Sequence, residues 1–271
     1  MTAQPMPHGT VLLEIDEAVA TVTLNRPETY NAMNNNLMED LRGAIEHAEA
    51  DQSVGVIVLT GSGRGFCAGA DLNTVGPTEE DSGISPPASS AIVGMDRYFN
   101  PCLRAIKNCT VPTIARVNGA AAGGGLGLAL ACDIVIAAQS AFFVATFGPR
   151  LGIVPDLGTT WSLPAKIGTA RAMGMAMLGD RVPANQAEEW GLIYKAVADD
   201  DLDTEVARAA NVLKVTSAAA MRRIRSTIET AALRSFSDQL DVERDHQEHL
   251  IPLNMGEGAA AFVEKRDPKF R

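Results

Sequence analysis

The sequence predicts an α/β fold, and three of its segments carry that prediction. Residues 10–25 alternate apolar and polar side chains around a turn at Asp16 and Glu17, which indicates a hairpin of half-buried strands. Residues 35–50 repeat apolar side chains at helical spacing, and residues 54–61 (VGVIVLTG) form a short β-branched run typical of a buried strand. The resulting order of strand, helix and strand is typical of the α/β class.

The same alternation continues through the middle of the chain. Residues 76–90 are polar, acidic and contain three prolines, so we expect a surface loop that borders a site. A helix is expected over residues 95–106 and a strand at 113–119 (TIARVNG). The glycine-rich run AAAGGGLGLAL at 120–130 follows, and DIVIAAQ indicates the next strand.

The end of the chain is expected to be helical and to contact other subunits. From about residue 157 the pattern is mostly helical, and it ends in amphipathic stretches near 202–215, 217–234 and 238–251. The final segment EGAAAFVEKRDPKF places an apolar patch beside three basic residues. We therefore expect these helices to pack on a neighbouring copy of the chain.

Composition limits the classes of partner. The 271 residues, 46% hydrophobic and 21% charged, predict one compact catalytic body. A net charge of −10 disfavours binding to nucleic acid or to an anionic membrane. No apolar run approaches the roughly 20 residues of a membrane span, and the first residues lack the features of a signal peptide, so we expect a cytoplasmic protein. The four cysteines show no metal-site or redox spacing, so no metal is expected, and Cys67 has no histidine near it in sequence to activate its thiol.

Two glycine-rich segments are candidates for binding an anion. The first, GSGRGFCAGADL at 61–72, follows a strand, and its small side chains expose main-chain N–H groups. The second, at 120–130, opens a predicted helix, where unpaired N–H groups and the positive end of the helix dipole converge. Taken alone, a segment like the first is more often an ordinary turn. The second has the alternative explanation that its glycines only let a helix pack closely on a strand. Neither has the spacing of a dinucleotide or phosphate loop, so a nucleotide cofactor is not supported.

Four motifs together resemble the crotonase (enoyl-CoA hydratase/isomerase) superfamily, from about residue 10 onward. They are FCAGADL, VNGAAAGGGLGLALACDIVIAA, FGPRLGIVPDLGTTWSLP and FVEKRDPKF. The resemblance implies a crotonase-like spiral of β-β-α turns that binds acyl-CoA over residues 1–200, and a C-terminal helical trimerisation region over 201–271. It also implies a homotrimer or hexamer, an acyl-CoA thioester as substrate and no separate cofactor, because coenzyme A is part of that substrate.

The resemblance also implies site residues, by motif position. The oxyanion hole would consist of the backbone N–H groups of Ala70 and Gly124. The coenzyme A moiety would contact seven residues, the last two from a neighbouring subunit: Arg26, Ala32, Ala68, Asp71, Leu72, Phe262 and Lys265.

The carboxylate near the hole decides the reaction. Typical hydratases of the family use two glutamates, and this chain has Gly127 and Gly148 at those positions. Water addition needs one group to activate water and another to deliver a proton, which glycine cannot do. Asp156 stands where isomerases of the family keep a catalytic aspartate, and one carboxylate suffices to move a proton between two carbons. Asp156 also precedes a predicted helix, so N-capping is the alternative explanation.

Other functions stay open at this point. A hydratase could use a single carboxylate or take a second one from Glu79, Glu80 or Asp81, and a silent acyl-CoA-binding protein could keep the hole without catalysis. A dehalogenase is disfavoured because Phe147 stands where those enzymes have tryptophan. Trp161 is expected in the core, and the four histidines are given no catalytic role. We therefore favour an isomerase with Asp156 as proton shuttle.

Overall fold

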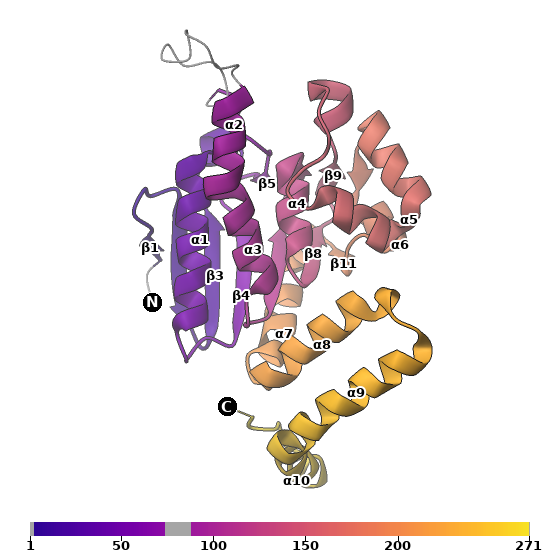
Figure 1. Cartoon of the computed structure of the whole chain (residues 1–271). Helices are drawn as coiled ribbons and strands as arrows, with labels where there is room; N and C mark the ends of the chain where they lie inside the picture. Colours follow the sequence, from indigo (N-terminus) through magenta and orange to yellow (C-terminus); the bar gives the residue numbers. More distant parts are fainter. Residues whose placement is uncertain (1–2, 74–87, 271) are drawn as a thin grey trace.

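The structure, a computed structural model, describes residues 3–73 and 88–270. In this part of the chain the strands form two sheets (Figure 1). The larger sheet contains, in spatial order, β1 (Gln4–Pro5), β2 (Val11–Asp16), β3 (Val19–Leu24), β4 (Val56–Gly61), β6 (Thr113–Val117), β8 (Ile134–Ala138) and β11 (Lys195–Val197). The smaller sheet contains β10 (Val182–Pro183), β9 (Phe142–Val144), β7 (Ala120–Ala122) and β5 (Gly65–Cys67).

The two sheets arise from a repeated unit of strand, strand and helix. In three successive units β4, β6 and β8 enter the larger sheet in parallel, and β5, β7 and β9 enter the smaller one in parallel. The helices that follow return the chain to the start of the next unit. The helical segments up to residue 189 are η1 (Pro27–Thr29), α1 (Asn35–Ala50), α2 (Ala88–Gly94), η3 (Met95–Phe99), α3 (Asn100–Asn108), α4 (Gly124–Ala131), η4 (Phe147–Leu151), α5 (Thr159–Leu178) and α6 (Ala184–Glu189). The predicted α/β class is confirmed, and the expected β-β-α repeat is present.

The first elements follow the predicted pattern closely. Strands β2 and β3 pair antiparallel, and Glu17 and Ala18 form the turn with φ of 44° and 69°, one residue later than predicted. Alternate residues of β3 are buried against α1, so one face of the sheet forms core and the other does not. Helix α1 begins at Asn34, whose side chain accepts a hydrogen bond from the Leu37 N–H.

The helix expected over residues 95–106 is present, but it is not α-helical throughout. Its first five residues form a π-helix, Met95–Phe99, and α3 begins at Asn100 with no break in the helical backbone. Pro101 lies in the first turn of α3 and has no N–H to donate to the carbonyl one turn earlier. The wider π-helical turn lies where this hydrogen bond is missing.

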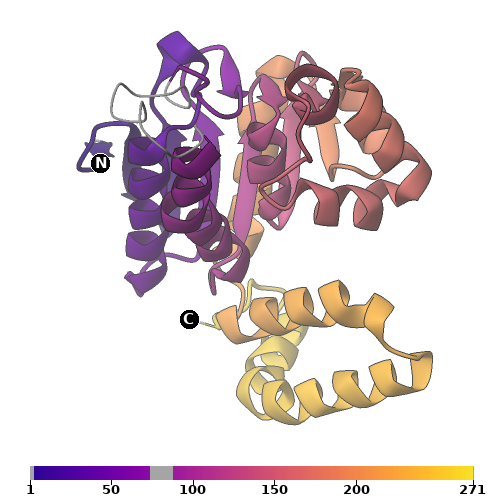
Figure 2. The same cartoon turned by 45° about the horizontal axis from the view of Figure 1, so that its top comes forward.

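The C-terminal helices divide into one that belongs to the body and others that project from it. Helix α7 (Leu202–Leu213) contacts β4, β6 and β8, whereas α8, α9 and α10 extend away from both sheets (Figures 1 and 2). The remaining helical segments are η5 (Asp199–Asp201), α8 (Ala218–Thr230), η6 (Ala231–Leu233), α9 (Phe236–Leu250), η7 (Ile251–Met255) and α10 (Gly256–Glu264). Among the described helices, none has both the length and the apolar character to cross a membrane.

Two ion pairs anchor α8 to the body, one between Lys107 of α3 and Glu229 and the other made by Arg225. Arg225 of α8 forms an ion pair with Asp133, which lies between α4 and β8, and also donates to the carbonyl oxygens of Cys109 and Val111. Asp133 in turn accepts hydrogen bonds from the N–H and hydroxyl of Thr113. Helix α8 is therefore tied to the body, while large apolar side chains beyond it in the extension are exposed.

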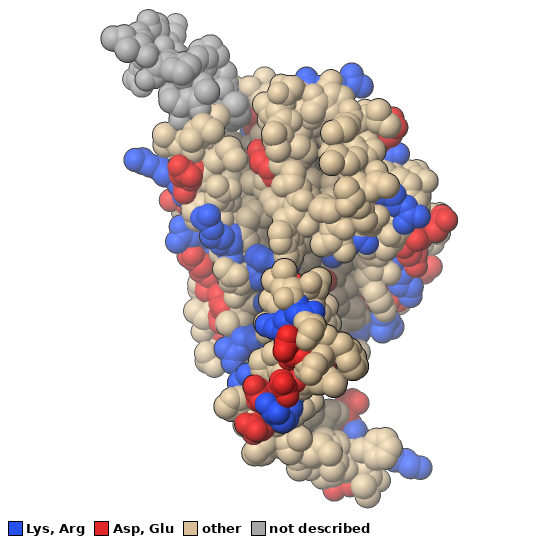
Figure 3. Space-filling model, turned by 45° about the vertical axis from the view of Figure 1, so that its right-hand side comes forward, with Lys and Arg blue, Asp and Glu red and all other residues tan. Residues whose placement is uncertain are grey.

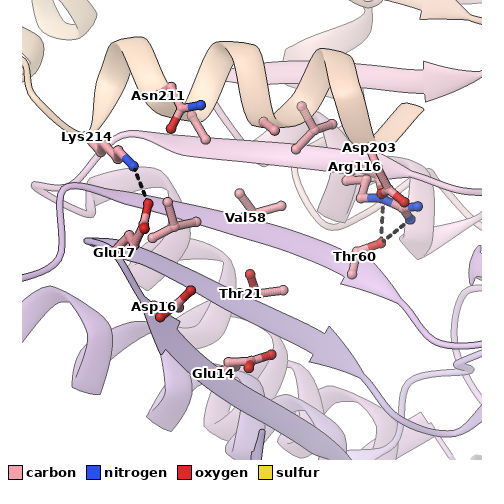
Figure 4. Close-up of a pocket in the computed structure, with 14 residues that line it drawn as sticks. Glu14, Asp16, Glu17, Thr21, Val58, Thr60, Arg116, Asp203, Asn211 and Lys214 are labelled. Atoms are coloured by element: carbon pink, nitrogen blue, oxygen red, sulfur yellow. Dashed lines mark hydrogen bonds and ion pairs between the residues drawn. The ribbon is translucent and has the colours of Figure 1, made fainter. Parts of the chain in front are cut away.

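A pocket of about 550 Å³ lies between α7 and the open face of β2, β3 and β4 (Figure 4). Two ion pairs stand at its ends, Arg116 with Asp203 at 2.7 Å and Lys214 with Glu17 at 3.2 Å. None of the residues that line it is a site residue predicted from the sequence. The candidate site lies elsewhere, where the glycine-rich segments meet.

Candidate active site

The two glycine-rich segments touch each other through their main chains. Gly69, with a φ of +97°, lies so close to the second segment that a Cβ atom added to it would be 2.9 Å from the Ala122 carbonyl oxygen. The same atom would be 3.3 Å from the Gly124 nitrogen. A side chain at position 69 would separate the segments, so glycine is needed both for the positive φ and for the close approach.

Each segment contributes a main-chain N–H group that the rest of the described chain leaves unbonded. Met33 binds on either side of Ala70: its N–H donates to the Gly69 carbonyl at 2.7 Å, and its carbonyl accepts from the Asp71 N–H at 2.8 Å. In a parallel bridge of this kind, the N–H of the middle residue, Ala70, points away from the partner. Gly124 is the first residue of α4, where N–H groups have no intrahelical acceptor. The pair can donate two hydrogen bonds to one negatively charged oxygen.

Asp156 lies between η4 and α5 and does not cap the helix. The N-cap of α5 is Gly158, and no side chain bonds to its first turn. The main-chain carbonyl of Asp156 accepts from the Thr159 N–H at 2.9 Å, which leaves its carboxylate free of the capping role that the sequence allowed. Partial burial raises the pKa of the Asp156 carboxyl, because removal from water disfavours the charged form.

Leu157 connects Asp156 to the N–H pair. Its side chain is 6% exposed, and a Cβ added to Gly124 would lie 2.6 Å from both Leu157 Cδ1 and Met33 Cε. The other apolar residues near Asp156 in sequence, Ile153 and Val154, do not contribute in the same way, because they are 49% and 75% exposed. Of these three apolar residues, only Leu157 is itself buried.

The position of the first hydratase glutamate is filled by main chain. A Cβ added to Gly127 would lie 2.5 Å from the Leu157 carbonyl oxygen and 3.0 Å from the Thr159 hydroxyl. That hydroxyl is fully buried and has no hydrogen-bond partner among the described residues. At the second glutamate position, a Cβ on Gly148 would lie 3.0 Å from the Ala176 carbonyl oxygen. A glutamate at position 127 would require the segment after Asp156 to move.

Three of the residues predicted to contact coenzyme A form one cluster. The Arg26 guanidinium donates to the Ala32 carbonyl at 2.6 Å and to the Asp71 carboxylate at 2.9 Å. The ion pair is nearly buried, with 16% and 6% of the two side chains exposed. Ala68 and Leu72 of the adjoining segment are exposed. Arg26 and Asp71 therefore hold the loops together, while Ala68 and Leu72 offer surface to a ligand.

Three further residues belong to this region and were not predicted from the sequence: Arg64, Met33 and Leu157. Arg64 donates a hydrogen bond to the Tyr30 hydroxyl at 2.8 Å and stacks over its ring at 5.5 Å, which places an exposed cation on the segment that carries Ala68. Arg64 could have been predicted as a ligand contact, because it is the basic residue within the glycine-rich run GSGRG. Met33 and Leu157 had no comparable signal, because their importance comes from contact with Gly124.

Phe262 and Lys265 lie far from this cluster within one chain. Phe262 is in α10 and 86% exposed, and Lys265 follows the helix. Figures 1 and 2 show α10 at the end of the molecule opposite β5 and the start of α4. The structure therefore does not bring these two residues to the other predicted site residues of the same chain.

Cys67 and Trp161 lie outside the chemistry of the candidate site. Cys67 is buried, which raises its thiol pKa to about 12 and keeps it from acting as a nucleophile near neutral pH. Trp161, expected in the core, is 55% exposed and carries the Lys107 ammonium 5.1 Å from its ring centre. Among the residues placed by the structure, no group of three histidines, cysteines or carboxylates is arranged to hold a metal ion.

Known proteins share this architecture over nearly the whole chain. The family model for enoyl-CoA hydratase/isomerase matches residues 14–271. A 1,2-epoxyphenylacetyl-CoA isomerase of Escherichia coli is 40% identical, covering 96% of this chain and 97% of that protein. A protein of Rhodobacter capsulatus named "probable enoyl-CoA hydratase" is 41% identical, with 98% and 99% covered. The crystal structure of an enoyl-CoA hydratase from Polaromonas superposes with a TM-score of 0.84 at 32% identity, covering 96% of this chain and 98% of that one. The chain therefore belongs to the enoyl-CoA hydratase/isomerase family, whose members have the crotonase fold and act on acyl-CoA thioesters.

Proposed function

We propose that the protein shifts the double bond of an enoyl-CoA, with Asp156 as the proton shuttle. The observation that carries this proposal is a half-buried carboxylate, Asp156, whose neighbour in sequence packs against Gly124 at the start of α4. Asp156 caps no helix, and its neighbour Leu157 contacts Gly124 directly. A half-buried carboxylate that caps no helix is suited to acid–base chemistry.

The reaction needs one proton transfer in each direction. The thioester oxygen accepts hydrogen bonds from the Ala70 and Gly124 N–H groups, which stabilise the negative charge as it develops. The Asp156 carboxylate removes a proton from C2 of a 3-enoyl thioester, and the electrons move into the extended enolate. The protonated acid then delivers that proton to C4, which gives the 2-enoyl thioester. The raised pKa of Asp156 suits both halves, because it strengthens the base and keeps the proton available for return.

Hydration is the alternative reaction, and the filled position at Gly127 opposes it. Adding water across the double bond requires a second group to activate water, and the Leu157 carbonyl occupies the space beside Gly127. The carboxylates of Glu79, Glu80 and Asp81, suggested from the sequence as substitutes, lie outside the described residues. A silent acyl-CoA-binding protein would have no use for a carboxylate whose burial costs stability.

We also propose that the chain works as a homotrimer or hexamer without a separate cofactor, in the cytoplasm. Large apolar side chains are exposed along the projecting helices, including Leu233 at 83%, Phe236 at 80% and Phe262 at 86%. Figure 3 shows a further uncharged area over the upper part of the body. Apolar surface of this extent is typical of subunit interfaces. In such an assembly, Phe262 and Lys265 of one subunit are free to approach the coenzyme A site of another.

The test is an ultraviolet assay with a 3-enoyl-CoA in deuterated buffer, combined with mass analysis of the product. We expect formation of the conjugated 2-enoyl thioester, and loss of 10²- to 10⁴-fold in rate in Asp156→Asn, the usual contribution of an acid–base group. Asp200→Asn, which changes an exposed aspartate, is the matched control. A product heavier by one water would favour hydration, and absence of any conversion would favour a binding protein.

A further inference from the structure

We propose that Leu157 is the positioning residue of the site: its side chain, packed on Gly124 as Met33 is, holds the neighbouring Asp156 in position relative to the N–H pair. The proposal rests on the function proposed above, since it concerns the residue that sets the geometry of the proton shuttle. It assigns a role to a side chain that touches the site without taking part in the chemistry.

The backbone of Leu157 is the first observation. Its φ is +50°, and Gly158 follows with a φ of +75°. Glycine adopts this left-handed conformation freely, whereas a bulky side chain is strained in it. The backbone alone would favour glycine here, so we infer that the leucine side chain contributes contacts that offset this strain.

The packing of the Leu157 side chain is the second observation. Leu157 lies against Gly124, whose N–H is half of the pair, and Met33, which hydrogen bonds on both sides of Ala70, lies against the same glycine. The two side chains thus lie against the same glycine, and together they connect Ala70, Gly124 and Asp156 in one packed unit. Both are buried, Met33 completely and Leu157 to all but 6%. A shift of Leu157 therefore changes the position of the carboxylate relative to both donors.

A second set of contacts, at Gly127 of α4, also holds the segment that follows Asp156. The Leu157 carbonyl and Thr159 hydroxyl lie against Gly127 of α4, and the Thr159 N–H holds the Asp156 carbonyl at 2.9 Å. The segment from 156 to 159 is therefore packed on α4 at two places, on Gly124 by the end of the Leu157 side chain and on Gly127 by the Leu157 carbonyl and Cβ and the Thr159 hydroxyl. Leu157→Ala keeps the atoms at Gly127 and removes the contact at Gly124, which makes that contact testable by substitution.

The test compares Leu157→Gly, Leu157→Ala and Leu157→Met in the full-length protein. Glycine relieves the left-handed strain and removes the side chain, alanine keeps the strain, and methionine restores most of the contact with Gly124. We expect the glycine and alanine variants to lose 10-fold or more in kcat with KM changed less than about 3-fold, since a displaced carboxylate affects the reaction and not the binding of coenzyme A. The acidic limb of their pH–rate profile should move to lower pH as water reaches Asp156. Leu157→Met should remain within about 3-fold of wild type.

The control is Leu41→Ala, which removes a fully buried leucine from α1. It should lower the melting temperature without moving the pH profile or the kcat of folded protein, as a purely structural leucine would. Folded Leu157→Gly with wild-type kcat and pH profile would overturn the proposal. If wild type itself fails to convert the 3-enoyl-CoA, the proposed function fails. The positioning role is then tested separately by carbon-13 titration of the Asp156 carboxyl, identified by its loss in Asp156→Asn. Identical titration in wild type and Leu157→Gly would refute it.

Discussion

Gly127→Ala tests whether the space beside α4 is filled as the structure indicates. In the interior of a helix this substitution normally stabilises a protein by about 1 kcal/mol. Here the new methyl group would lie 2.5 Å from the Leu157 carbonyl oxygen, whereas ordinary contact begins near 3.4 Å. The segment that carries Asp156 must therefore retreat by about 1 Å. Overpacking of this kind costs about 1–3 kcal/mol, so the net change in unfolding free energy should lie between about 0 and 2 kcal/mol of destabilisation.

The effect on activity should be larger than the effect on stability. Displacing a catalytic group by about 1 Å can lower a rate by about 100-fold. Gly174→Ala is the matched control, because Gly174 also lies inside a helix, α5, and has open space around its Cα. It should raise the melting temperature by about 2–4 °C, the shift expected from about 1 kcal/mol, and leave kcat unchanged. Calorimetry and the isomerase assay on both variants measure these effects. A Gly127→Ala protein as stabilised as Gly174→Ala, with full activity, would refute the filled position.

Two further predictions concern charge. Burial raises the folded-state pKa of Asp156, so its cost to stability is absent below the ordinary aspartate pKa of about 3.9 and grows as pH rises through the raised value. Asp156→Asn should therefore raise the melting temperature at pH 7, with a smaller gain near pH 4, and an equal gain at both would contradict this. Arg225→Ala leaves Asp133 without its cation and should destabilise by about 2–4 kcal/mol, while limited proteolysis becomes faster in α8–α10. Arg244→Ala, whose partners are exposed, should change stability by less than about 1 kcal/mol and leave proteolysis unaltered.

The elements with one strong period were predictable from the sequence. The helix expected over 35–50 is α1 (Asn35–Ala50), and the β-branched run at 54–61 contains the fully buried β4. Both have a pattern that local geometry alone explains. Trp161 was misplaced because α5 has apolar residues on more than one face, so its sequence does not reveal which face is buried. The π-helix before α3 depends on one missing N–H at Pro101, a detail that periodicity does not record.

The candidate site was predictable by motif but not by geometry. The meeting of Gly69 with Gly124 joins segments more than fifty residues apart, and no local rule gives that distance. The same is true of the Leu157 carbonyl beside Gly127, which turns a missing glutamate into an occupied space. Whether Asp156 caps its helix could not be decided from the sequence, since the same residue type serves both purposes. The structure answers the question, because the N-cap of α5 is Gly158 and not Asp156.

The use of main-chain N–H groups has a consequence for how this family diversifies. In the proposed site, Ala70 and Gly124 donate through atoms that every residue except proline possesses, so replacing a side chain at either position by another side chain leaves the donor atom in place. Substitutions at positions such as 127, 148 and 156 would then alter the acid–base groups and leave the proposed thioester-binding pair unchanged. On this proposal, one reaction can replace another without loss of substrate binding at the intermediate stage.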